Sequence, residues 1–162
     1  MLDRPTDSAM SPHAEASAHH GGLPGGTGDL LLLIGRVLVG QLFVVSGWGK
    51  LFAMSAFGAG LAKNGVPEMM VAPLSVIAPC VEFFGGLAIV FGVATRWTAA
   101  LMLIFTVVAA FVGHRYWEAA EAARRGQEIN FYKNVTIVGG FLFLIVAGAG
   151  RFSIDGLFRR RG

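Results

Sequence analysis

Three ionisable side chains lie within or at the edge of stretches that are otherwise apolar enough to cross a lipid bilayer: Arg36, Glu82 and His114. A charge at membrane depth costs several kcal/mol unless it is paired or hydrated, so such residues usually mark a functional site. Arg36 and Glu82 carry opposite charges, and an arginine–carboxylate pair can form two parallel hydrogen bonds. The sequence therefore predicts a polar spot inside a membrane protein, where Arg36 and Glu82 meet if the register of their helices allows it.

Two interpretations of this polar spot stay open. In the first, Arg36, Glu82 and His114 flank a cavity that binds a polar ligand, such as the headgroup of a quinone, or relays protons. In the second, Arg36 and Glu82 lock two helices together. A buried ion pair stabilises less than apolar packing does, which argues against a purely structural purpose. Three further polar residues near span ends are interpreted as interfacial candidates: Lys50, Lys133 and Asn134.

The composition points to an integral membrane protein of one domain. Of the 162 residues, 54% are hydrophobic and 14% are charged, and the mean hydropathy is +0.63. Soluble domains carry about 25% charged residues. The net charge of +3 comes from bases at helix ends and in the last residues, without a basic stripe interleaved with aromatics. These bases fit membrane topology and lipid headgroups, so we expect the lipid bilayer as a partner and no nucleic acid.

Four apolar runs each approach the ~20 residues that a helix needs to span a bilayer. Their approximate bounds are 30–51, 71–94, 97–113 and 131–150. Gly85-Gly86 and Gly139-Gly140 lie in the second and fourth runs, where small residues let helix backbones approach closely. The predicted fold class is all-α, an integral membrane four-helix bundle. The connection 113–130 is rich in charge and predicts a short amphipathic helix on the membrane surface.

The two ends of the chain differ from this bundle. Residues 1–29 are rich in Gly, Ser and His, so we expect a flexible tail. Its histidines lack a rigid frame, and we expect no metal site. Residues 30–158 form the membrane domain, and residues 159–162 are a basic tail. The compact run Arg159-Arg160-Arg161 lies close to a span and has no nearby acids, so we expect both termini in the cytoplasm.

Five strings at span ends or on charged faces carry a resemblance to a known family: Gly35-Arg36, Phe43–Leu51 (FVVSGWGKL), Glu82–Gly86 (EFFGG) with Gly92–Arg96 (GVATR), Lys133-Asn134 before Gly139-Gly140, and Gly148–Asp155 (GAGRFSID). In this order, the chain resembles the DoxX family of small bacterial four-helix membrane proteins over residues 30–158. One departure is Ala149, where we expect proline in the family pattern.

The resemblance implies an integral membrane subunit of a quinone-linked oxidoreductase or a respiratory-type complex in the bacterial cytoplasmic (inner) membrane. Family members are associated with thiosulfate:quinone oxidoreductase and with oxidoreductase complexes that handle thiol stress. A bound quinone is the cofactor implied, and other subunits or a second copy are the partners. The sequence itself holds no paired histidines for haem within the spans and no cysteine cluster for iron–sulfur.

Two other functions remain as alternatives, and whether the chain is itself an enzyme stays open. One is a non-catalytic accessory subunit that anchors or stabilises a larger membrane complex through helix packing. The other is a pathway for protons or small molecules, because intramembrane ionisable residues often serve that purpose. Four short helices without an internal repeat are not typical of a carrier.

Overall fold

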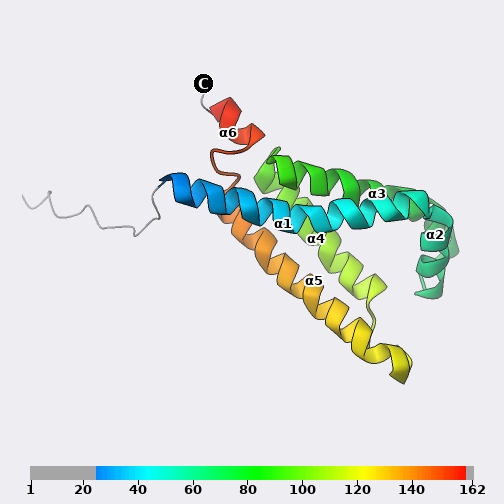
Figure 1. The fold of residues 1–162 in the computed structure, drawn as a ribbon. Coiled ribbons are helices and arrows are strands. Elements are labelled where there is room, and N and C mark those ends of the chain that lie inside the picture. The colour runs from blue at the N-terminus through cyan, green and yellow to red at the C-terminus, as the bar shows by residue number, and fades with distance from the viewer. Residues whose placement is uncertain (1–24, 160–162) are drawn as a thin grey trace, which may run out of the picture.

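The computed structural model describes residues 25–159, which form six α-helices (Figure 1). The helices are α1 (Gly25–Phe52), α2 (Met54–Lys63), α3 (Glu68–Phe91), α4 (Thr95–Gly113), α5 (Glu121–Ala147) and α6 (Ile154–Arg159). Of these, α1, α3, α4 and α5 are long and apolar enough to cross a membrane. The predicted all-α fold with four spanning helices is therefore confirmed. Most of the predicted flexible tail, up to residue 24, and the last three residues of the basic tail lie outside the described residues.

The four spanning helices form two antiparallel pairs. Helix α1 packs along α3, α4 packs along α5, and the short α2 packs against α3. Figure 1 shows the α4–α5 pair crossing the α1–α3 pair obliquely. The core joins both pairs, since each of the four helices contributes a buried side chain: Phe43, Ile89, Met102 and Phe141.

Glycines allow the close approach of α1 and α3. A Cβ atom added at Gly40 would lie 2.8 Å from the carbonyl oxygen of Gly86, and one at Gly47 would lie 2.6 Å from the backbone nitrogen of Phe83. Larger residues at these positions would push the helices apart. Gly139 and Gly140 do not make such a contact, because an added Cβ meets nothing within 4 Å at Gly139 and only Val39 at 3.8 Å at Gly140. The close approach predicted for that pair was wrong.

Helix boundaries differ from the sequence prediction, most of all at the start of α1 and in the two connections that follow α1 and α4. Helix α1 begins at Gly25, so residues 25–29 are helical, and α2 is an additional helix in the connection 52–70. Residues 121–130 are not a separate surface helix but the first turns of α5. Continuing a helix adds one hydrogen bond per residue, whereas starting a new one requires a costly nucleus. The charges predicted to face the membrane surface instead decorate this extension, where Arg125 and Glu128 pair at 3.0 Å.

Candidate functional site

The two ends of the bundle hold different polar groups. We call the end where α1 and α4 begin and α3 and α5 end the terminal end. The opposite end, where α1 and α4 end and α3 and α5 begin, is the cavity end (Figure 1). Charged side chains within the spans lie toward both ends, and each end is described in turn.

At the cavity end, Glu82 of α3 pairs with Lys50 of α1. Lys50 Nζ donates a hydrogen bond to Glu82 Oε2 at 2.6 Å, and the Glu82 side chain is only 6% exposed. The ammonium group of Lys50 also lies 5.4 Å from the centre of the Phe57 ring, which belongs to α2. Helix α2 and the close α1–α3 contact at Gly47 thus hold the lysine beside the carboxylate.

Arg36 does not form the predicted ion pair with Glu82. The antiparallel register of α1 and α3 places Arg36 level with Ile89 and Val90, about two helical turns from Glu82. The charge pattern did not determine the register of α1 against α3, and this register decides which charges meet. Glu82 is matched by Lys50 instead, a residue assigned to the membrane interface by its position near the end of the span.

Arg36 is fully buried at the terminal end and binds main-chain oxygens. Its Nη1 donates to the carbonyls of Val90 at 3.1 Å and Ile89 at 3.4 Å, and its Nη2 donates to the carbonyl of Phe152. The last carbonyls of a helix lack intrahelical partners and carry the negative end of the helix dipole, so a cation there is stabilising. Arg36 therefore ties α1 to the end of α3 and to the link before α6.

Gly92 follows α3 and makes room for this arginine. Its φ is +68°, a left-handed conformation that favours glycine, and an added Cβ would clash with the Arg36 guanidinium and with Ser153. Gly92 belongs to one of the strings that carry the family resemblance, and its contact with Arg36 explains why a glycine is needed there.

Asp155 of α6 completes the terminal end by capping α4. Its carboxylate oxygens accept hydrogen bonds from the backbone N–H groups of Ala94 at 2.7 Å and Thr95 at 2.8 Å. Burial raises the pKa of Asp155, but hydrogen bonds from Thr95 and Ala94 and attraction to Arg159 outweigh it, so the pKa lies below its ordinary value of 3.8. The carboxylate is thus held in its charged form at the positive end of the α4 dipole.

A cavity of about 250 Å³ adjoins the Lys50–Glu82 pair at the cavity end. It takes in every candidate residue of the sequence analysis except Arg36. Polar and charged residues from all four spanning helices line it: Ser46, Lys50, Glu82, Thr106, His114, Asn130, Lys133 and Asn134. The apolar part of the wall includes Leu42, Phe43, Phe105, Ala109 and Ile137. The arrangement combines cationic donors, amides, a carboxylate and an imidazole around one cavity.

His114 has a defined orientation in this cavity wall. Its Nδ1 lies 2.9 Å from Gln127 Oε1, and this side-chain contact orients the ring. Gln127 lies in the first turns of α5, so the extension of that helix beyond the predicted span orients the histidine.

Three polar residues of the cavity wall were not singled out from the sequence: Ser46, Thr106 and Asn130. Helical spacing offered a signal for two of them. Ser46 lies one turn before Lys50, and Asn130 lies one turn before Asn134, so each shares a face with a named candidate. Thr106 gave no signal, because a threonine within an apolar span usually bonds to its own helix, and its Oγ1 does donate to the Met102 carbonyl at 2.6 Å.

The fold and the cavity define a class of protein, a small four-helix integral membrane protein with an ionisable site between its helices. The sequence model of the DoxX family matches residues 31–115, which run from α1 to just past the end of α4. The chain belongs to the DoxX family. Lys50, Glu82 and His114 lie within the matched region, whereas Asn130, Lys133 and Asn134 lie beyond it.

Relatives cover more of the chain than the family model does. Inner membrane protein YqjF of Escherichia coli K12 is 38% identical over 133 residues, which is 82% of this chain and 95% of that protein. Inner membrane protein YphA of the same organism is 36% identical over 131 residues, 81% of this chain and 92% of that protein. The chain is accordingly a multi-pass protein of the inner membrane, as predicted.

A more distant similarity joins the chain to the Surfeit locus protein 4 homolog of Schizosaccharomyces pombe. The two are 28% identical over 113 residues, which is 66% of this chain and 35% of that protein. No solved structure matches the chain.

Proposed function

We propose that this DoxX family protein is the membrane subunit of a quinone-linked oxidoreductase or respiratory-type complex, and that a quinone headgroup binds in the cavity beside Lys50 and Glu82. The observation that carries the proposal is the cavity itself. It brings the carboxylate of Glu82 and the imidazole of His114 together with Lys133 and Asn134, whose side chains carry hydrogen-bond donors, around a space of about 250 Å³.

The chemistry of the lining fits such a headgroup. Two ring carbonyls require hydrogen-bond donors, and the ammonium groups of Lys50 and Lys133 and the amide of Asn134 are donors. Pockets that enclose a whole drug-sized ligand measure about 300–1,000 Å³, so this smaller cavity suits a headgroup whose tail stays among the lipids. A quinone bound there would supply two-electron oxidation and reduction coupled to two protons. Glu82 and His114 are the groups of this chain that would pass those protons on.

The electrons come from elsewhere in this proposal. Across residues 25–159, no three His, Cys, Asp or Glu side chains gather in a way that could hold a metal ion, and the chain contains a single cysteine. In the proposed complex a partner subunit carries the electron donor, and the chain presents the quinone to it.

The test is to purify the protein in a mild detergent and measure quinone per chain after organic extraction. We expect stoichiometric quinone with the wild type and at least a tenfold loss with Glu82→Gln, which keeps the shape of the side chain but cannot take up a proton. Glu121→Gln is the matched control, because Glu121 is an exposed carboxylate at the same end of the bundle. A folded Glu82→Gln protein that retains its quinone would exclude Glu82 from the site.

A second candidate function is a non-catalytic accessory subunit that stabilises a larger membrane complex. The observation in its favour is that Lys50 Nζ lies 2.6 Å from Glu82 Oε2. The two charges compensate each other without a ligand, and the ion pair holds α1 to α3. Copurification of a larger complex in fixed ratio, without quinone bound to this chain, would favour this alternative.

A further inference from the structure

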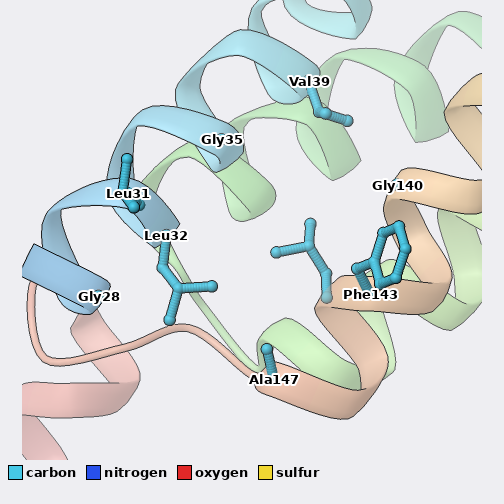
Figure 2. A pocket seen from close by; sticks show the side chains of 9 residues that line it. Gly28, Leu31, Leu32, Gly35, Val39, Gly140, Phe143 and Ala147 are labelled. Atoms are coloured by element: carbon cyan, nitrogen blue, oxygen red, sulfur yellow. The ribbon is translucent and has the colours of Figure 1, made fainter. Parts of the chain in front are cut away.

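An apolar groove runs between α1 and α5 at the terminal end, away from the polar cavity. Its volume is about 510 Å³. Figure 2 shows Leu32 and Val39 of α1 on one side and Phe143 and Ala147 of α5 on the other. The groove lies in the membrane-spanning parts of both helices.

No side chain of the described residues fills this groove. An added Cβ would meet nothing within 4 Å at Gly28 or at Gly35, both of which line it. The glycines of α1 that face α3 behave differently, since Gly40 and Gly47 are in tight contact with that helix. The same helix thus uses glycine to approach α3 and leaves open space toward α5.

A charged hollow of about 480 Å³, the mouth, adjoins the groove at its end. Leu32 and Ala147 line both spaces, so the apolar groove and the charged hollow lie next to each other. Arg151 and Arg159 supply the positive charge of this mouth, and Asp29 supplies a negative one.

The two carboxylates near the mouth are largely engaged by the main chain. Asp29 accepts a hydrogen bond from the backbone N–H of Arg151 at 2.7 Å and lies 3.9 Å from its guanidinium. Asp155 is occupied by the backbone of α4. Arg159 is exposed and forms no ion pair with any residue between 25 and 159. Among the residues that line the mouth, the two arginines Arg151 and Arg159 outnumber the one carboxylate, Asp29, so the lining carries a formal net charge of +1.

Exposed apolar side chains mark the depth of this mouth in the membrane. Trp97 is 82% exposed at the start of α4, and Phe158 is 69% exposed in α6 beside Arg159. Tryptophan collects at the level of lipid headgroups, and short amphipathic helices lie at the same level. The arginines of the mouth consequently lie at headgroup level, and the groove extends from them into the acyl-chain region.

We propose that the groove and its mouth bind one anionic phospholipid of the surrounding bilayer. An acyl chain occupies the space between α1 and α5, and the phosphate contacts Arg151 and Arg159. Basic pockets between membrane helices bind anionic headgroups because each arginine attracts the phosphate, while a purely apolar occupant such as an isoprenoid tail would leave the mouth unused. This site is separate from the polar cavity, so lipid binding here can be tested independently of quinone binding.

The experiment reconstitutes the full chain in nanodiscs of phosphatidylcholine that contain a minor fraction of phosphatidylglycerol. Native mass spectrometry then counts the lipids retained after gentle release. We expect the wild type to retain one phosphatidylglycerol in preference to phosphatidylcholine, and we expect this preference to weaken at high salt. Equal retention of the two lipids by the wild type would overturn the proposal without the need for any variant.

Two variants locate the lipid. Arg151→Gln/Arg159→Gln should lower the affinity for phosphatidylglycerol roughly 25-fold, at about fivefold per arginine. Lys63→Gln/Arg124→Gln is the charge-matched control, because both bases are exposed at the cavity end. Gly35→Leu should block the groove, whereas Gly49→Leu adds the same side chain to an exposed position of α1 where an added Cβ meets nothing within 4 Å.

Each outcome decides the matter. Loss of the preference in the mouth and groove variants, with retention in both controls, supports the site. Retention of the preference after Gly35→Leu would mean that the lipid lies elsewhere. Recovery of quinone in place of phospholipid, displaced by Gly35→Leu, would assign the groove to a quinone tail and overturn the proposal.

Discussion

Buried charges at the terminal end of this bundle bind main-chain groups, whereas those at the cavity end bind other side chains. At the terminal end, Arg36 donates to main-chain carbonyls and Asp155 accepts from main-chain N–H groups. At the cavity end, Lys50 and Glu82 satisfy each other, and His114 is oriented by Gln127. In the first arrangement each charge is bound to main-chain groups at a helix end. In the second, side chains pair with side chains around a cavity of about 250 Å³.

The contrast teaches that the position of a charge in a span does not by itself distinguish a structural group from a functional one. Arg36 and Glu82 are both almost completely buried. What separates them is the partner, since a helix end offers fixed carbonyls whereas a neighbouring side chain offers a group that can turn or change its protonation state. Substitutions at the terminal end should therefore affect stability, and those at the cavity end should affect binding.

The largest effect is expected for Arg36→Met. It leaves the carbonyls of Val90 and Phe152 without their charged donor, and we expect the free energy of unfolding to fall by about 3 kcal/mol. Unfolding by sodium dodecyl sulfate titration from mild detergent micelles measures the change. Arg96→Met is the control, because Arg96 donates to Val146 at an exposed site of the same end, where substitutions stay within about 0.5 kcal/mol. Equal stability of the two variants would remove the distinction between the ends.

A smaller effect is expected for Asp155→Ala, which removes the cap of α4. At neutral pH we expect a loss of about 1 kcal/mol. The pKa of Asp155 is lowered in the folded protein, so its contribution is present above the ordinary value of 3.8 and is lost as the pH falls through the folded pKa. The unfolding free energies of wild type and variant should thus converge below pH 3.8. Curves that stay parallel into acid would contradict this role.

The smallest effect on stability is expected for the double variant Lys50→Met/Glu82→Leu. Replacing a buried ion pair by apolar residues of similar size is often neutral or stabilising, so we expect a change of less than about 1 kcal/mol. Lys50→Met alone should cost more, because it leaves Glu82 buried without its partner. The double variant should also lose bound quinone. If it unfolds as readily as Arg36→Met, the cavity end is a structural lock and the comparison fails.

Much of the candidate site was visible in the sequence because ionisable residues are costly in apolar spans. Glu82, His114, Lys50, Lys133 and Asn134 were all singled out, and all of them line one cavity. The cost of a polar group in an apolar span identified these residues, but it did not predict which partner each side chain contacts. Lys50 was assigned to the interface, since its place near the end of a span is where lysines commonly anchor a helix. Only the packing of α2 and α3 turns it toward Glu82.

The sequence by itself determined that this protein lies in the inner membrane, that four helices span it, and that it belongs to the DoxX family. Hydropathy runs and local motifs settle these points because they depend on residues close together in the chain. The tertiary structure decided which charges meet. The register of α1 against α3 follows from the close contacts of Gly40 and Gly47, and a shift of two turns could bring Arg36 level with Glu82 while moving Lys50 away from it. Such a register depends on the shape of two packed surfaces, which no single stretch of sequence contains.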